Sequence, residues 1–158
     1  MSIQRKAAEI GVAHTTPQAR LGELYIDELG NHYRYMQADG AVTANVLYSY
    51  VPVTWQIDAP IKLAVEPADG KQVFCCASPV TLADNEYAWV FVGPGVVTLT
   101  TAGNVAVDVA IFGVNADGTV DDAITTCVIP GLTAVAAITG ATTGSFYAPH
   151  ALYAYDAP

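Results

Sequence analysis

The chain has 158 residues, of which 53% are hydrophobic and only 13% are charged, and its formal net charge is −9. A typical soluble domain has about 25% charged residues, so a chain this poor in charge usually has much of its surface covered by lipid or by other subunits. No apolar run reaches the roughly 18 residues of a membrane-spanning helix, and no apolar segment typical of a signal peptide follows Arg5 and Lys6. We therefore expect no membrane association, synthesis in the cytoplasm, and burial of surface by neighbouring protein chains.

The charges are unevenly distributed along the chain. All six Lys and Arg residues lie in residues 1–71, whereas residues 72–158 contain seven acidic residues and no basic one. A nucleic-acid-binding protein needs cations that replace the phosphate counterions, and an enzyme usually concentrates ionisable groups at one site. The charge pattern therefore excludes a nucleic-acid partner and argues against catalysis.

Residues 1–20 are predicted to form an extended N-terminal arm. Ser2 can cap a short helical turn that reaches Glu9, but Gly11 and Pro17 prevent a longer helix. A locally basic arm on an acidic body suits docking to an acidic partner, although a solvated, disordered terminus has the same composition. The candidate docking residues are Ile3, Arg5, Lys6, Ile10 and Arg20.

From residue 21 onward the pattern is that of short β-strands. Residues 24–27 and 33–37 flank a turn at 29–32 and predict a hairpin. Residues 46–53 predict a strand that 55–57 continues, and Pro60 and Pro67 mark loops. Further strands are predicted at 73–77, 87–92, 96–101, 105–114 (with a hairpin turn at 115–118), 119–120, 124–129, 133–138, 145–147 and 152–155.

These strands recur at intervals of roughly 8–12 residues with turns between them, which is typical of a β-sandwich or barrel. We therefore predict an all-β protein, in which residues 21–158 form a single compact β-sandwich or barrel-like domain of β-tulip type. Residues 73–77 are wholly apolar, as expected for a strand buried on both faces. In such a strand Cys75 and Cys76 point to opposite faces. Three cysteines without a signal peptide also predict reduced thiols.

No catalytic, metal or cofactor motif is evident. His14, His32 and His150 fall in separate predicted loops and lack a second ligand at metal-site spacing. The apolar strand around the adjacent cysteines should raise the pKa of their thiols rather than activate them. The acidic residues Asp117, Asp121 and Asp122 lack the spacing of a helix–loop–helix calcium site. We therefore expect no catalytic residues, no metal and no cofactor.

The aromatic residues offer three interpretations. Tyr33 and Tyr35 share one strand face by the period of two, as do Tyr48 and Tyr50. Such faces suit cross-strand packing at a subunit interface, where tyrosine is favoured, or a platform for sugar rings. Trp55 and Trp89 fit an interface or a core equally well. The interface candidates are Tyr33, Tyr35, Trp55 and Trp89.

Two segments carry a resemblance to a known class of protein. The segment 21–44 contains Gly30-Asn31-His32-Tyr33-Arg34-Tyr35-Met36-Gln37-Ala38 followed by Gly40-Ala41-Val42-Thr43-Ala44, and the segment 84–95 contains Tyr87-Ala88-Trp89-Val90-Phe91-Val92-Gly93. Together with the Ala, Val, Gly and Thr-rich stretch that follows, they resemble the small tailed-phage head proteins known as capsid decoration, or cement, proteins. The resemblance extends from about residue 21 to about residue 148, with Ala88 where glycine is common in that class.

This resemblance implies a virion structural protein on the exterior of an icosahedral capsid, made in the cytoplasm of a bacterial host. It implies binding to the major capsid protein across coat-protein junctions, self-association as a homotrimer, an arm that pairs with the shell, and no catalysis. The alternatives that remain open are another virion component, such as a head fibre base or a tail or neck protein, and a carbohydrate-binding β module.

Overall fold

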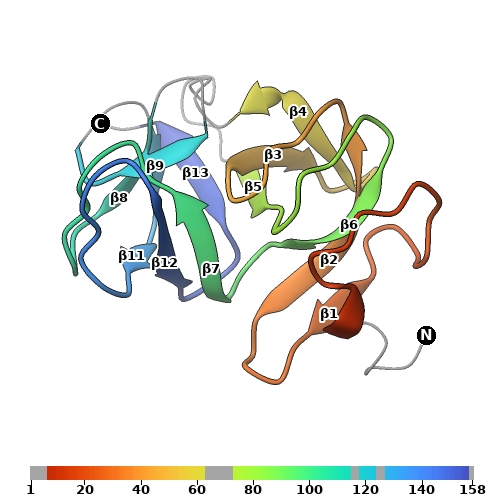
Figure 1. Ribbon diagram of the computed structural model, residues 1–158, viewed down its shortest axis with the longest axis horizontal. Coiled ribbons are helices and arrows are strands. Elements are labelled where there is room, and N and C mark those ends of the chain that lie inside the picture. Colours follow the sequence, from red (N-terminus) through yellow and green to blue (C-terminus); the bar gives the residue numbers. More distant parts are fainter. Residues whose placement is uncertain (1–6, 63–72, 115–117, 124–126, 157–158) are drawn as a thin grey trace.

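The computed structural model describes residues 7–62, 73–114, 118–123 and 127–156, and in these ranges nearly all regular structure is β (Figure 1). Residues 7–9 form one helical turn. The all-β prediction is therefore confirmed. The strands are β1 (Leu24–Ile26), β2 (His32–Asp39), β3 (Leu47–Val51), β4 (Gln56–Lys62), β5 (Val73–Ala77), β6 (Tyr87–Phe91), β7 (Gly95–Thr100), β8 (Ile111–Val114), β9 (Thr119–Asp121), β10 (Cys127–Ile129), β11 (Thr133–Ala134), β12 (Thr143–Ala148) and β13 (Tyr153–Asp156).

The first half of the molecule is a closed barrel. The strands β2, β4, β3, β5 and β6 pair in this order, and β6 pairs back with β2. The β2–β4 pair is parallel, and the other pairs in the ring are antiparallel. Closure leaves these strands few free edges, and β1 adds the predicted hairpin partner to the outside of β2, with Leu24 opposite Arg34.

Every second side chain along the barrel strands points into the barrel. In β2, Met36 and Ala38 point inward, and in β6 the inward residues are Ala88 and Val90, all of them fully buried. They form what we call the barrel core, which is listed in full as Met36, Ala38, Val42, Val46, Tyr48, Ile57, Cys76, Leu82, Ala88, Val90 and Val92. The period-two pattern that predicted these strands thus also determines which side chains enter the barrel.

The second half, β7 to β13, packs beside the barrel (Figure 1). The strands β13, β10, β8 and β9 continue the sheet from β5, and β11, β12 and β7 form a separate three-stranded sheet. The apolar side chains between them form what we call the second core, which includes Leu99, Ile111 and Phe146. This core also contains Leu47 and Phe91, which point outward from barrel strands, so the outer wall of the barrel completes it.

Strand β5 contributes side chains to both cores. Cys76 belongs to the barrel core and Cys75 to the second core, and both side chains are fully buried. The predicted opposite orientation of the two side chains is therefore confirmed. Burial raises the pKa of the Cys76 thiol, which keeps it protonated.

The outer face of β2 and β6 carries a third group of buried side chains, which we call the aromatic cluster. Tyr25, Tyr35 and Trp89 form its centre, and Ile10 and Ala19 of the N-terminal segment pack against it. The rings of Tyr35 and Trp89 lie 5.2 Å apart, centre to centre. Burial of this apolar surface explains why residues 7–20 lie on the barrel.

This arrangement corrects the predicted arm. His14 bridges Tyr87 through backbone hydrogen bonds, and the N–H of Gln18 donates to the Tyr35 hydroxyl at 3.0 Å. Residues 7–20 are therefore attached to the body and are not an extended arm. The candidates Ile3, Arg5 and Lys6 lie outside the described residues.

Asn31 joins the two halves. Its side-chain oxygen accepts a hydrogen bond from the N–H of Val96 in β7 at 2.7 Å, and its side-chain nitrogen donates to Asp27 at 2.7 Å. Gly95 lies so close to Asn31 that a Cβ atom there would collide with it, and its φ of 131° also favours glycine. The β1–β2 turn is thereby connected to the first strand of the second half.

Four predictions for individual segments need correction. Residues 55–57 do not continue β3, because the chain turns at 52–55 and returns as β4. Pro60, predicted to lie in a loop, falls within β4, next to a register shift between β3 and β4 where a ladder tolerates proline. Of the strand predicted at 105–114, only β8 forms, and of the strand predicted at 133–138, only β11 forms. Val105 and Ile138 instead make an isolated bridge with each other. Pro67 and the turn at 115–117 lie outside the described residues.

Candidate binding site at the barrel mouth

One end of the barrel is open and lined by the residues that follow the barrel core along each strand. Arg34, Tyr50, Phe74 and Val92 lie two positions from the buried residues Met36, Tyr48, Cys76 and Val90, respectively, and so share their inward orientation. They surround a hollow of about 410 Å³, which we call the barrel mouth. Ligand sites are common in the mouths of barrels, with volumes of about 300–1,000 Å³.

Trp55 forms one side of the barrel mouth and has an unusual backbone. Its φ is 56°, in the left-handed region that bulky residues avoid at a typical cost of about 1–3 kcal/mol. Its N–H donates to the Val51 carbonyl at 2.8 Å, and its carbonyl accepts from the Gln37 N–H at 3.1 Å. Gly22 lies against the indole edge, where any Cβ atom would collide with the ring. The surrounding backbone therefore holds this ring at the barrel mouth.

Arg34 lies over the Trp55 ring. The guanidinium carbon is 4.6 Å from the ring centre, and Nη1 donates to the Gly22 carbonyl at 2.6 Å. No ion pair joins Arg34 to a carboxylate in the part of the chain that the structure describes. A guanidinium has five N–H donors, and Arg34, which lines the barrel mouth, uses one of its nitrogen atoms, Nη1, for the Gly22 carbonyl.

Two further aromatic rings complete the lining. The Tyr50 ring stacks near Trp55 at 6.0 Å, with 20° between the planes, and lies 5.9 Å from Phe74. Burial raises the pKa of Tyr50 to about 12, against the opposing effect of the Arg34 charge. Tyr50 therefore remains a neutral hydroxyl at physiological pH, and its side chain can donate a hydrogen bond.

Exposed apolar side chains line the barrel mouth or lie within two residues of its lining. Phe74 and Leu24 line the hollow and are 44% and 41% exposed. Ile26, two residues along β1, is 47% exposed, and Val51 and Val53 flank Pro52 in the adjoining turn with exposures of 43% and 90%. We call these five residues the apolar rim. Apolar side chains that gather in this way are typical of surfaces that contact another molecule.

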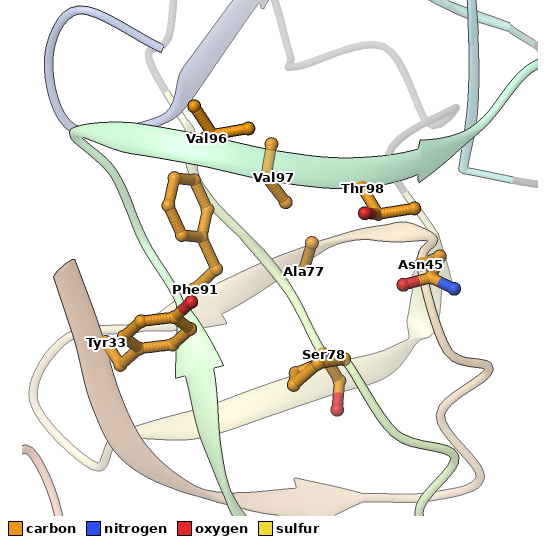
Figure 2. A pocket seen from close by; sticks show the side chains of 9 residues that line it. Tyr33, Asn45, Ala77, Ser78, Phe91, Val96, Val97 and Thr98 are labelled. Atoms are coloured by element: carbon orange, nitrogen blue, oxygen red, sulfur yellow. The ribbon is translucent and has the colours of Figure 1, made fainter. Parts of the chain in front are cut away.

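A second, smaller hollow lies between the two halves (Figure 2). It has a volume of about 140 Å³ and lies between Tyr33 and Phe91 of the barrel half and Val97 of β7, with Asn45 and Ser78 at its other side. The Ser78 hydroxyl donates to the Val80 carbonyl at 2.6 Å and so stabilises a turn. Burial, with the nearby Asp27 and Tyr25, raises the pKa of Tyr33. We regard this hollow as a packing seam because its polar groups do not form a nucleophile–base pair.

The structure places the four predicted interface residues in three different environments. Tyr35 and Trp89 are 0% exposed within one chain, so the interface hypothesis is wrong for them and they are core residues. Tyr33 is half-buried at the seam, and Trp55 lies at the barrel mouth. Of the predicted arm residues, Ile10 packs on the aromatic cluster, and Arg20 is exposed beside Trp55 in an adjoining hollow.

Sequence reasoning missed Arg34, Phe74 and the apolar rim. The available signals were the shared face of Tyr48 and Tyr50 and the single cation between Tyr33 and Tyr35. In the described ranges, no group of three or more His, Cys, Asp or Glu side chains could hold a metal. Those ranges also contain no helix long and apolar enough to cross a bilayer.

No protein-family model matches the chain, and comparison with curated proteins and with solved structures finds no match. The features of the molecule that bear on its function are therefore the geometry of the barrel mouth, the charge pattern and the resemblance of the segments 21–44 and 84–95.

Proposed function

We propose that the chain is a non-catalytic structural protein of a tailed-phage head, which decorates the capsid exterior and stabilises it by binding the major capsid protein across coat-protein junctions. In this proposal it is made in the bacterial cytoplasm and assembles on the shell as a homotrimer. The observation that carries the proposal is the apolar rim. It consists of Leu24 and Phe74, which line the barrel mouth, and Ile26, Val51 and Val53, which lie within two residues of its lining, and all five are more than 40% exposed.

The charge pattern supports a protein partner. Buried interface centres are poor in charged residues and rich in aromatic residues and arginine, which matches Tyr50, Trp55 and Arg34 at the barrel mouth. A protein that binds only the assembled shell stabilises that shell by mass action. Weak individual contacts suffice, because a trimer multiplies them.

The first test is the copy number in purified particles. Gradient sedimentation and quantitative mass spectrometry would compare the amount of this chain with that of the major coat protein. We expect a ratio near one per coat subunit. A ratio of a few per hundred would instead indicate a fibre base, tail or neck component, and absence from particles would reject the virion proposal.

A second test addresses the surface. The double variant Leu24→Ser and Phe74→Ser removes two apolar side chains from the rim. We expect it to reduce co-sedimentation with particles by about tenfold, since complete burial of such a side chain contributes roughly 1.5–3 kcal/mol and 41% and 44% of the two side chains are exposed before docking. Tyr147→Ser is the matched control, because Tyr147 is 50% exposed on β12 in the other half. Equal binding by both variants would show that the rim is not the docking surface.

The proposed contribution of the arm is now restricted to residues 1–6. Removal of residues 2–6 takes away Ile3, Arg5 and Lys6 but leaves Ile10 and the rest of the packed segment in place. We expect this deletion to weaken docking to particles without changing the free energy of unfolding. Unchanged docking would remove the arm from the proposal.

A carbohydrate-binding module is the second candidate, because the rings of Tyr50, Trp55 and Phe74 gather at one hollow. Sugar rings stack on such faces, and a glycan array with tryptophan fluorescence as the readout tests this function. A uniform absence of response would reject it.

A further inference from the structure

The barrel mouth combines one cation with an apolar lining. Arg34 lines the hollow together with Leu24, Tyr50, Trp55 and Phe74. The guanidinium is fixed on two sides, by the Trp55 ring beneath it and by the Gly22 carbonyl. A planar guanidinium with free donors fits a carboxylate through two parallel hydrogen bonds.

The position of Arg34 is prepared before any ligand arrives. The left-handed backbone of Trp55 and the contact with Gly22 orient the ring, and the ring in turn orients the guanidinium. Preorganisation of this kind reduces the entropy lost on binding. Backbone strain that the surrounding structure maintains is a feature of binding sites more often than of passive surface.

From these observations we propose that the barrel mouth binds an extended acidic segment of a partner protein, in which an Asp or Glu stands beside a large apolar residue. Arg34 receives the carboxylate, and the neighbouring apolar side chain enters between Tyr50 and Phe74. The inference takes one element from the proposed function, namely that the partner is a protein chain. Trp, Tyr and Arg are the residue types that most often dominate the energy of protein interfaces.

The lining favours a peptide over a sugar. A sugar presents many hydroxyl groups that need partners, whereas the side chains with polar atoms at the barrel mouth are Arg34, His32, Tyr50 and the Trp55 indole. The apolar rim also continues beyond the hollow through Ile26 and Val53. That extension suits the flanking residues of a peptide, which would lie on the rim.

The overall charge of the protein indicates what kind of salt dependence to expect. With a net charge of −9, the chain repels anions at long range. The attraction at Arg34 is therefore local and depends on close apolar contact. Binding should consequently weaken only slightly as salt is raised, unlike binding to an extended basic patch.

The test uses synthetic peptides that place Phe or Trp beside Glu in a neutral Ser and Gly sequence, with Gln counterparts as the matched controls. Binding to the full-length protein would be measured by calorimetry and by the fluorescence of Trp55. We expect the Glu peptides to bind roughly ten- to a hundredfold more tightly than the Gln peptides, the range for a charge-assisted hydrogen-bonded pair. This comparison needs no protein variant and so does not depend on folding of a mutant.

Two variants test whether the peptides bind at the barrel mouth. Arg34→Gln should remove the difference between Glu and Gln peptides, whereas Phe74→Ser should weaken both kinds by a similar factor. Tyr147→Ser should change neither. If Arg34→Gln does not fold, Arg34→Lys takes its place, and it should reduce the difference because lysine lacks the planar fork.

Equal binding of the Glu and Gln peptides, or binding of glycans without binding of peptides, would overturn the inference. Its failure is distinguishable from failure of the proposed function. If acidic peptides do not bind but the protein sediments with heads at about one copy per coat subunit, only the inference fails. If they bind through Arg34 but the chain is absent from heads, only the capsid proposal fails.

Discussion

The barrel half, residues 7–92, and the second half, residues 95–156, bury their apolar side chains in different ways. The barrel closes on itself and encloses a core of its own. The two sheets of the second half enclose their core only with the help of Leu47, Cys75 and Phe91 from the barrel wall. The second half therefore needs side chains of the barrel wall to complete its core, whereas the barrel core is made of barrel residues alone.

The two halves differ equally in chemistry. Arg34, Tyr50, Trp55 and the apolar rim all belong to the barrel half, whereas residues 95–156 contain no Lys or Arg. The comparison assigns recognition to the barrel half and support to the second half.

The largest effect should follow the loss of a central aromatic ring. Trp89→Ala in the aromatic cluster and Phe146→Ala in the second core each remove a fully buried side chain, at a cost of about 3–5 kcal/mol in the free energy of unfolding. We expect Trp89→Ala to destabilise the whole chain, because the second half needs the barrel wall. Phe146→Ala should loosen the second half while the barrel stays folded. Hydrogen exchange resolved by residue would measure both.

Equally increased hydrogen exchange in both halves would contradict the proposed dependence. If Phe146→Ala increased exchange in β2 and β6 as strongly as in β8 and β12, the two halves would be a single cooperative unit.

The next largest effect should come from the connection between the halves. Asn31→Ala removes the acceptor of the Val96 N–H and the donor to Asp27, and an unpaired buried group costs about 1–3 kcal/mol. Asn104→Ala is the control, because Asn104 makes a comparable bond to the Gly140 N–H in an exposed loop. We expect a clear loss of stability in denaturant unfolding for Asn31→Ala and a loss below about 0.5 kcal/mol for Asn104→Ala.

A smaller effect, of opposite sign, is expected at Asp58. Burial and the charge of Asp39, its cross-strand neighbour between β2 and β4, raise the pKa of Asp58. The folded protein therefore holds this proton more tightly than the unfolded chain. Stability contributed by protonated Asp58 is thus present at low pH and is lost as the pH rises above about 4, the ordinary pKa of an aspartate.

Asp58→Asn should accordingly stabilise the protein at neutral pH by roughly 0.2–1 kcal/mol, the usual size of a cross-strand charge effect. The gain should disappear in acid. Glu28→Gln, at an exposed turn position, is the control. A gain of equal size at all pH values would show that Asp58 does not act through its charge.

The smallest effect concerns the quenching of tryptophan fluorescence. Trp89 is fully buried, whereas Trp55 lines the barrel mouth beneath the Arg34 guanidinium. We expect iodide to quench part of the tryptophan emission and caesium to quench much less, because Arg34 attracts the anion. Arg34→Gln should remove the difference. Equal quenching by both ions in the unmodified protein would contradict the proposed access to Arg34.

Local patterns predicted three elements of the barrel half correctly. The β1–β2 hairpin, β6 and the two faces of β5 follow from alternation and turn residues, and all three agree with the structure. These features depend on neighbours in the sequence. The same is not true of the turn at Trp55, since a left-handed tryptophan is held by Gly22 and Gln37, which are distant in sequence.

The remaining errors have a common cause. Residues 7–20 and the residues Tyr35 and Trp89 carry the composition of an arm and of an interface, yet they bury one another within a single chain. Composition indicates that an apolar surface will be covered, but only the tertiary fold determines what covers it. The barrel mouth was missed for a similar reason, because its lining comes from β1, β2, β3, β5 and the turn before β4.

The adjacent thiols of β5 have a practical consequence. Cys76 faces the inside of the barrel, and Cys75 faces the second core, so the two sulfur atoms are protected by different parts of the molecule. A thiol-alkylating reagent can reach Cys76 only when the barrel opens, and Cys75 only when the second half separates from the barrel wall. The order in which the two neighbouring cysteines become alkylated would therefore reveal which half opens first.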